Sequence, residues 1–233
     1  MTKIVISQPV FFPWPGFFSH LLTADLVVWL DDAQFSKGWF TNRCQIANST
    51  SRERWLTIPV TSSSHFKCIN ELTPCRHFFD DHIELLESYY RNAPFFDSMI
   101  DIYATAMNKS ANPLVELLIF GVQITFEAMH GYPLQSTLSS SLGINGNGSD
   151  RVLSICKKLG GSQYITGHGA RNYLDHARFE REGVEVLYMD YDVVPWRCLK
   201  TKLSILDLIA HVGMRNAYEY YSPKTIHWSD FVS

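Results

Sequence analysis

The sequence predicts an α/β fold with a Rossmann-like, mainly parallel sheet and a helical insertion. Two apolar runs rich in β-branched residues, Ile4–Ile6 and Leu26–Leu30, flank a short helical stretch at about Phe17–Thr23. This order is typical of a βαβ unit, in which a helix joins two parallel strands. Strand, helix and strand recur near the C-terminus, and between the two regions, from about residue 76 to 131, the apolar period is helical. We therefore expect a single α/β domain over residues 1–233 that carries this insertion.

The N-terminal part is expected to hold two buried strands and a hairpin. Gln8-Pro9 ends the first strand, because proline has no N–H for a ladder hydrogen bond. After the second strand, Arg43–Ala47 and Arg54–Val60 are predicted to pair around a polar turn. Thr61–Ser64 has the small residues of a surface loop, and Phe66–Leu72 is a weaker strand candidate.

Three helices are predicted for the insertion. The first covers Arg76–Arg91 and the second covers Phe96–Met107. The third begins at Asn112-Pro113, since proline is favoured in the first turn of a helix, and it continues to His130. Gly131 then supplies a C-cap.

The C-terminal part alternates short strands and helices between glycine-rich turns. In order, we expect a short strand at Leu134–Ser136, a loop at Ser139–Asp150, a helix to Leu159, a strand at Gln163–Thr166, a helix from about Ala170 to Arg178, a strand at Glu185–Tyr188 and a helix from Ser204 to Gly213.

Composition restricts the class of protein. Hydrophobic residues make up 46% and charged residues 18% of the 233 residues, so a sizeable core is expected and disorder is not. The formal net charge is −3, which disfavours nonspecific nucleic-acid binding. We find no signal-peptide pattern and no segment apolar enough to span a membrane, and we expect a cytoplasmic location. Five cysteines without a closely spaced pair make a disulfide framework improbable.

A first candidate site follows the two N-terminal strands. Gln8 closes the first strand, and Asp31 and Asp32 close the second. Open α/β sheets bind ligands at the carboxyl ends of their strands, so these side chains are expected near a small-molecule pocket. The alternative is a solvated turn with two surface carboxylates. The further substrate-binding candidates in the same loop are Gln34, Lys37, Asn42 and Arg43.

A second candidate site follows the strand at Gln163–Thr166. Gly167 and Gly169 leave backbone N–H groups accessible at a strand–helix turn, where a phosphate or carboxylate could bind. Arg171 adds a possible fork donor to the same anion. His168 is the predicted catalytic histidine, because an imidazole in a glycine turn can titrate near neutral pH. The alternative is that the glycines serve turn geometry and that the histidine bonds nearby carbonyls.

A set of short motifs runs through the chain: Gln8-Pro9, Pro13-Trp14, Gly16, Ala24-Asp25, Asp31-Asp32, Gln34-Phe35 and Asn42-Arg43, followed by Trp55–Val60, Gly167 with Tyr173, and Leu203–Asp207. This set resembles the WbqC-like family, and its N-terminal part resembles the opening signature of that family. The resemblance covers nearly the whole chain, and it adds Trp14 and Tyr173 to the substrate-binding candidates. At Pro195-Trp196-Arg197 the chain departs from the Tyr-x-Gln that the family often shows.

The family is associated with bacterial surface-polysaccharide (O-antigen) synthesis. The resemblance implies a transferase that adds an aminoacyl group such as glycyl, or another acyl group, to an amino sugar. A nucleotide-sugar is the expected substrate. Asp31 or Asp32 would act as general base or orient the amine, and His168 would assist proton transfer. The alternative is a non-catalytic sugar- or nucleotide-binding subunit of a polysaccharide-modification complex, because no standard catalytic motif occurs.

The sequence does not identify a cofactor, and ATP and Mg²⁺ are the candidates. Asp31 and Asp32 could bind magnesium beside a phosphate. No dedicated metal site is predicted, since Cys68, Cys75 and His77 lack zinc-site spacing. Nucleic acid is an expected partner only if an aminoacyl-tRNA is the acyl donor.

Overall fold

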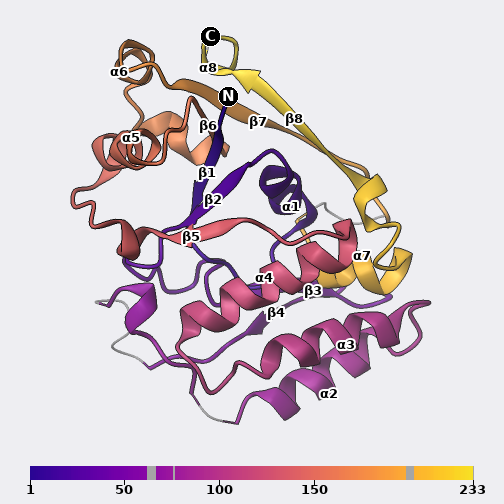
Figure 1. Ribbon diagram of the computed structural model, residues 1–233. Coiled ribbons are helices and arrows are strands. Elements are labelled where there is room, and N and C mark those ends of the chain that lie inside the picture. The colour runs from indigo at the N-terminus through magenta and orange to yellow at the C-terminus, as the bar shows by residue number, and fades with distance from the viewer. Residues whose placement is uncertain (62–66, 76, 198–201, 233) are drawn as a thin grey trace.

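A six-stranded mixed sheet forms the centre of the computed structural model, which describes residues 1–61, 67–75, 77–197 and 202–232 (Figure 1). Five neighbouring strands are parallel, and the last is antiparallel to its neighbour. From one edge to the other the strands are β5 (Ser136–Leu138), β2 (Leu26–Trp29), β1 (Lys3–Ser7), β6 (Gln163–Thr166), β7 (Glu185–Val193) and β8 (Tyr221–His227). This confirms the predicted Rossmann-like α/β class.

The strand order creates a switch point between β1 and β6. From β1 the chain proceeds outwards to β2 and β5, and it then returns to β6 and proceeds the other way. Val5 of β1 therefore has Val27 on one side and Ile165 on the other. At a switch point the connections leave the two carboxyl ends in opposite directions, so a crevice opens between them. Gln8 and Gly167, which follow β1 and β6, lie at this crevice.

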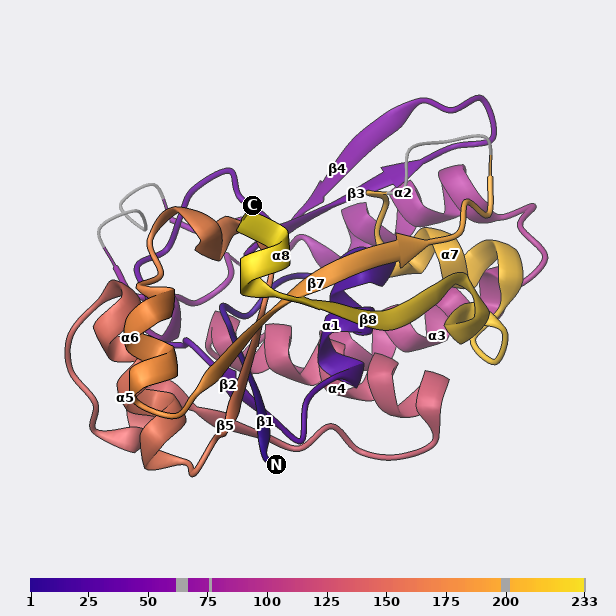
Figure 2. The same ribbon diagram turned by 90° about the horizontal axis from the view of Figure 1, so that it is seen from above.

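Helices cover both faces of the sheet (Figures 1 and 2). The strand residues alternate between two cores, as the pleat of a strand requires. Val5 packs in the core that includes α1 (Pro15–Leu22) and α4 (Leu114–His130). Ile4 and Ile6 face the opposite core, with α5 (Gly148–Lys158) and α6 (His176–Arg181). The short apolar runs that predicted buried strands are thus buried from both sides.

The predicted hairpin and, after it, the three predicted helices lie near their expected positions. β3 (Arg43–Ala47) and β4 (Glu53–Thr57) pair as a separate antiparallel sheet, which lies away from β1 (Figure 2). The helices are α2 (Phe79–Tyr90), α3 (Phe96–Met107) and α4. Gly131 caps α4 with a left-handed φ of 78°, as predicted.

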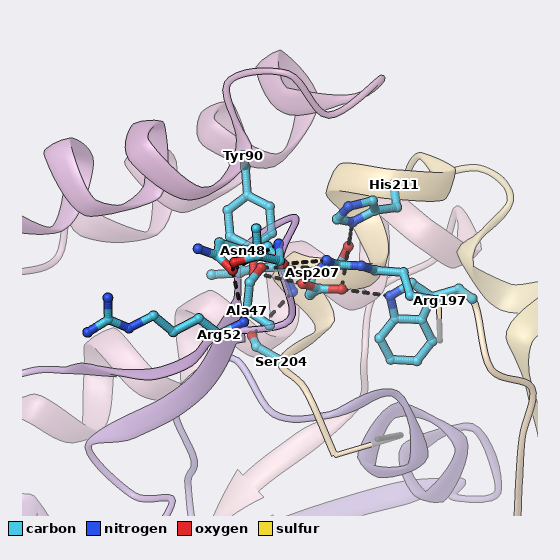
Figure 3. Close-up of polar contacts among 11 residues, drawn as sticks. Ala47, Asn48, Arg52, Tyr90, Arg197, Ser204, Asp207 and His211 are labelled. Atoms are coloured by element: carbon cyan, nitrogen blue, oxygen red, sulfur yellow. Dashed lines mark hydrogen bonds and ion pairs between the residues drawn. The ribbon is translucent and has the colours of Figure 1, made fainter. Parts of the chain in front are cut away.

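A buried polar cluster ties the hairpin to α7 (Ile205–Val212), as Figure 3 shows. The Asp207 carboxylate is fully buried and accepts hydrogen bonds from Tyr90 Oη (2.8 Å), Arg197 Nη1 (2.8 Å) and Trp196 Nε1 (2.7 Å). The Arg197 guanidinium also donates to the carbonyl oxygens of Ala47 (3.2 Å) and Asn48 (2.6 Å) at the end of β3. These shared donors fix the position of the hairpin relative to α7.

The start of α7 also holds the loop that follows β1. The Ser204 hydroxyl caps the helix by accepting from Leu206 N and donates to the Phe12 carbonyl at 2.7 Å. Ile205 N donates to the carbonyl of Pro13 at 2.8 Å. The predicted helix start at Ser204 is confirmed, and its cap anchors the chain just before Trp14.

Two predicted elements are wrong. The described part of the expected strand at Phe66–Leu72 contains a 3-10 turn, Ile69–Glu71, because Glu71 reaches back to the backbone N–H of Cys68. The expected helix from Ala170 to Arg178 is two elements, a 3-10 turn at His168–Asn172 and then α6, because Asp175 caps a new helix start by accepting from Arg178 N.

Other boundaries shift, and some elements near the C-terminus were not predicted. The expected loop at Ser139–Asp150 includes a 3-10 turn, Ser139–Leu142, and the start of α5. The short strand expected at Leu134–Ser136 is β5, at Ser136–Leu138. β8 and α8 (Trp228–Val232) were not predicted. Within the predicted loop Thr61–Ser64, residues 62–64 lie outside the described residues.

Candidate functional site

A cavity of about 550 Å³ lies at the switch point of the sheet. Its wall begins with Gln8 after β1, continues through Trp14 and α1, and closes with Gly167 and Gly169 after β6. Concave sites of this size with aromatic walls and a few polar groups are typical of small-molecule binding. The aromatic residues of the wall are Trp14, Phe17, Trp39, Phe40, Tyr164, Tyr173 and Tyr191.

Two glycines permit the close packing of this wall. A Cβ atom on Gly16 would lie 2.2 Å from the Trp14 ring, so only glycine lets the indole fold over the start of α1. The Trp14 ring in turn lies 4.9 Å from the ring of Tyr191 on β7. A Cβ on Gly167 would lie 2.9 Å from the Tyr191 hydroxyl. Burial raises the pKa of Tyr191 to about 12, so this hydroxyl stays protonated at neutral pH.

His20 of α1 places a neutral imidazole in the cavity wall. Its Nε2–H donates to the Ile165 carbonyl at 3.0 Å, which leaves Nδ1 as the acceptor nitrogen of the ring. Burial lowers the pKa of His20 to about 4, although this hydrogen bond acts in the opposite direction. His20 is thus buried and at the same time part of the cavity wall.

A second cavity of about 450 Å³ adjoins the first, and both share Leu30 and Tyr173 in their walls. Asp32, Gln34 and Arg151 line it, together with the residues Gly146–Gly148 that lead into α5. Arg151 Nη2 pairs with the Asp32 carboxylate at 2.5 Å, and the hydroxyl of Ser139 donates to Asp32 at 2.6 Å. Asp32 and Gln34 therefore line the same cavity, next to an arginine from a different part of the chain.

Asp31 has a different environment from its neighbour Asp32. It is 2% exposed and lines neither cavity. Its oxygens accept from Ser140 N (3.0 Å), Ser140 Oγ (2.6 Å), Asn70 Nδ2 (3.1 Å) and Ser139 Oγ (3.2 Å). Burial alone raises the pKa of Asp31, but these hydrogen bonds outweigh burial and hold the pKa below its ordinary value. The Asp31 carboxylate thus fixes the turn at Ser139–Leu142 against the end of β2.

The His168 side chain lies behind the cavity wall. Its Nε2–H donates to the Met189 carbonyl at 2.7 Å, and its ring lies 5.0 Å from Tyr191 and 4.7 Å from Phe231. His168 and Arg171 are exposed, and neither is among the residues that line the two cavities. Gly167 and Gly169, on either side of His168, do line the first cavity. These two residues of the second candidate site therefore lie in the same cavity as Gln8 of the first candidate site.

Three further predicted residues lie outside both cavities. Lys37 is exposed. Asn42 is buried, and its side-chain amide donates to the Ile58 carbonyl at 2.8 Å at the start of the hairpin. Arg43 lies on the hairpin with its guanidinium carbon 3.9 Å from the centre of the Trp55 ring.

Sequence reasoning missed Arg151 and Tyr191. Arg151 follows the stretch Ser139–Asp150, for which the sequence predicts a loop, and its distance from Asp32 in the chain hides their pairing. Tyr191 lies on β7 beyond the predicted end of that strand, at Tyr188. A longer alternation over Glu185–Val193 was the signal that could have found it.

The two carboxylates at the site already have donors from the protein. Asp31 is saturated by donors, and Asp32 is shared between Arg151 and Ser139. Within the described ranges, no group of three or more His, Cys, Asp or Glu side chains converges on a point. Among these same residues no helix is both long and apolar enough to cross a membrane.

Comparison with known proteins supports the resemblance seen in the sequence. The profile of the WbqC-like protein family matches residues 8–219. The chain is also 26% identical over 220 residues to the uncharacterized protein Rv1507c of Mycobacterium tuberculosis (strain ATCC 25618 / H37Rv), covering 91% of this chain and 95% of the relative. No solved structure matches the chain. Because the family match spans most of the sequence, including both walls of the cavity, the chain belongs to the WbqC-like protein family.

Proposed function

We propose that this protein is a transferase that adds an aminoacyl or other acyl group to an amino sugar in bacterial surface-polysaccharide biosynthesis. The observation that carries the proposal is the cavity at the switch point, where a neutral imidazole shares an aromatic wall with Gln8. The resemblance to the WbqC-like family supplies the biological setting. A nucleotide-linked or lipid-linked amino sugar is the expected acceptor.

The aromatic wall suits a ring-shaped ligand. Trp14 and Tyr191 present apolar faces to a cavity of about 550 Å³, a volume in the range that small-molecule sites usually have. Aromatic faces pack against the C–H face of a sugar or against a nucleobase, and the Tyr191 hydroxyl and the Gln8 amide can supply hydrogen bonds. These residues would select the ring and fix its orientation.

Acyl transfer to an amine requires the amine to lose a proton. In the proposed step the amine nitrogen attacks the acyl carbon, the new C–N bond forms, and the bond from that carbon to the leaving group breaks. Nδ1 of His20 accepts the amine proton and passes it to the leaving group. Because burial lowers the pKa of His20 to about 4, the imidazole is unprotonated at neutral pH.

Of the two predicted carboxylates, Asp32 has the better position for a role at the substrate. It lines the second cavity, and its charge is oriented by Arg151. We propose that Asp32 orients the acceptor amine, and that the second cavity holds the acyl donor. The donor is a free amino acid activated by ATP or an aminoacyl carrier.

The test combines thermal-shift titration with product analysis by mass spectrometry. Nucleotide-linked amino sugars are expected to raise the melting temperature, because ligands that bind only the native state stabilise it by mass action. Addition of glycine with ATP and Mg²⁺, or of an acyl thioester, is then expected to give a product that carries the acyl group. Gln8→Ala should weaken the thermal shift, whereas Gln135→Ala, an exposed residue outside both cavities, should not. Equal shifts for the two variants would place the ligand elsewhere.

The alternative function is that of a non-catalytic sugar- or nucleotide-binding subunit of a polysaccharide-modification complex. It is favoured by the internal hydrogen bonds of two predicted catalytic residues, Asp31 and His168. The same experiment separates the two functions. The subunit would be favoured by three results together. The ligand raises the melting temperature, no product forms under any donor condition, and His20→Ala binds the ligand as wild type does.

A further inference from the structure

A chain of aromatic side chains leads out of the cavity onto the β3–β4 hairpin. Trp39 and Phe40 line the cavity, and their rings lie 5.8 Å apart in an edge-to-face arrangement. The Phe40 ring lies 5.7 Å from that of Trp55 on β4, also edge to face. Trp39 is 61% exposed and Trp55 is 37% exposed, so both present much of their area to solvent. Contiguous exposed aromatic residues beside a cavity are typical of a binding surface.

Arg43 completes this surface, which we call the outer platform (Trp39, Phe40, Trp55 and Arg43). Its guanidinium stacks over Trp55 at 3.9 Å. Within the described part of the chain, this guanidinium has no carboxylate partner, and its buried Nε has no hydrogen-bond acceptor. Because the Nε atom is buried, the terminal Nη groups are the donors that Arg43 can offer to a polar ligand.

The strand pattern shows that the platform is an outward face of the hairpin. Leu56 is buried, whereas its neighbours Trp55 and Thr57 are exposed, as the alternation of a half-buried strand requires. The hairpin is held in place because Arg197 donates to the carbonyls of Ala47 and Asn48 (Figure 3). A platform on a fixed element loses little freedom when a ligand binds.

We propose that the outer platform binds the second sugar ring of an oligosaccharide acceptor whose first ring occupies the cavity. The inference deepens the proposed function by naming the acceptor class, and it rests on that function for the choice of a sugar. The C–H face of the outer ring stacks on the exposed indole of Trp55 or Trp39, and its hydroxyl oxygens accept hydrogen bonds from Arg43. Continuity with the cavity supports this occupant, because Trp39 and Phe40 belong to both surfaces.

A membrane surface is the competing occupant, since tryptophan and arginine also occur at lipid interfaces. Surfaces that bind anionic lipid carry clusters of basic residues. Here Glu53 is exposed between Arg52 and Arg54, and it accepts from Gln45 on the platform face of the hairpin at 2.5 Å. Alternating charge fits a soluble carbohydrate better than an anionic bilayer.

The experiment is an array of amino-sugar oligosaccharides of one to six rings, probed with wild type, Trp55→Ala and the control Tyr132→Ala. Tyr132 is 52% exposed and belongs to neither cavity at the switch point. Wild type and the control are expected to bind two-ring ligands more tightly than single rings. Trp55→Ala should lose about tenfold in affinity for the longer ligands, the effect of losing one stacked ring, and keep its single-ring affinity. Arg43→Gln should also weaken the longer ligands.

Three results would overturn the platform. One is affinity that does not depend on the number of rings, and another is a Trp55→Ala variant that binds like wild type. The third is that wild type binds no oligosaccharide on the array but binds phosphatidylglycerol vesicles, and that Trp55→Ala abolishes this vesicle binding. The proposed function fails separately. If binding depends on the number of rings but no acyl transfer occurs, the outer platform is supported and the proposed function is not. If acyl transfer to a nucleotide-linked amino sugar occurs without dependence on the number of rings, the proposed function is supported and the outer platform is not.

Discussion

Two polar regions of this protein differ in how completely their groups are paired. Around Asp207, a fully buried carboxylate receives hydrogen bonds from Tyr90, Trp196 and Arg197. At the switch point of the sheet, by contrast, His20 and Gln8 face a cavity of about 550 Å³. His20 uses one ring nitrogen to fix its orientation and keeps the other as an acceptor.

This difference in pairing distinguishes side chains that stabilise the fold from side chains that can bind a ligand. A buried polar group without partners costs free energy, so a saturated cluster such as that of Asp207 stabilises the structure and offers nothing to a substrate. The adjacent residues Asp31 and Asp32 repeat the contrast on a smaller scale, since the first is saturated and the second lines a cavity. Substitutions in the two regions should therefore differ in whether they affect stability or binding.

The largest effect on stability is expected from Asp207→Ala. Removal of the buried carboxylate leaves the largely buried Arg197 guanidinium without its counter-charge and loosens the hairpin, so unfolding should become easier by about 3–5 kcal/mol. Urea denaturation measures the change. Asp192→Ala, which removes an exposed partner of Lys224, is the matched control and should leave the midpoint unchanged. If Asp207→Ala unfolded at the wild-type midpoint, the cluster would not be what fixes the hairpin.

His20 should make the stability of the protein depend on pH. The pKa of His20 is about 4 in the folded protein and 6.5 in the unfolded chain, a difference that corresponds to about 3 kcal/mol. Between pH 6.5 and 4 the unfolded chain binds a proton that the folded protein does not, so stability falls as the pH falls through this window. Above pH 6.5 both states are neutral, and the contribution is constant.

Urea midpoints of wild type and His20→Leu between pH 4 and 8 isolate this contribution. Burial also lowers the pKa of His130 to about 4 and that of His82, so both proteins should lose stability in acid. Wild type should lose more, and the difference between the two curves belongs to His20. Parallel curves would mean that the pKa of His20 is the same in the folded protein and in the unfolded chain, contrary to its burial in the cavity wall.

The pair Asp31→Asn and Asp32→Asn sharpens the comparison between neighbouring residues. Asp31→Asn leaves donors of Ser140 and Asn70 badly matched and should cost about 1–3 kcal/mol at pH 7. Asp32 is 29% exposed in its side chain, so loss of its pair with Arg151 should cost less than about 1 kcal/mol. We expect Asp32→Asn to act on turnover instead, which is measured with the transferase assay.

Acid titration checks the Asp31 assignment. The pKa of Asp31 is lower in the folded protein than its ordinary value of 3.8, so its stabilisation is present above that value and is lost as the pH falls through the folded pKa. Asp31→Asn should remove this part of the acid sensitivity, and Asp32→Asn should retain it. If both variants were equally stable at pH 7, the environments of the two carboxylates would not differ as the structure indicates.

The sequence predicted the sheet and part of the cavity wall because these depend on local patterns. Apolar runs marked β1 and β2, a short strand was expected at Gln163–Thr166, and the switch point then brings Gln8 and Gly167 together. The pairing of Asp32 with Arg151 depends on how α5 packs against the end of β2, which no local pattern encodes. Likewise, the sequence could not separate Asp31 from Asp32, because the partners of Asp31 include Asn70, Ser139 and Ser140, all far along the chain.

The smallest expected effect comes from two glycines at the cavity wall. In Gly167→Ala the new Cβ would lie 2.9 Å from the Tyr191 hydroxyl, so Tyr191 must shift, and the melting temperature should fall by about 2–4 °C, or about 1 kcal/mol. Gly169→Ala meets no atom within 4 Å, and its backbone is outside the left-handed region, so the melting temperature should stay constant or rise slightly.

Ligand titration then separates the two glycine variants in a second way. Gly169 also lines the cavity, so its methyl group occupies space that a substrate would use. Gly169→Ala should therefore weaken binding of a nucleotide-linked amino sugar without destabilising the protein, whereas Gly167→Ala should do both. If Gly169→Ala bound the ligand as wild type does, the substrate would lie on the Gln8 and Trp14 side of the cavity, and the turn after β6 would have no contact with it.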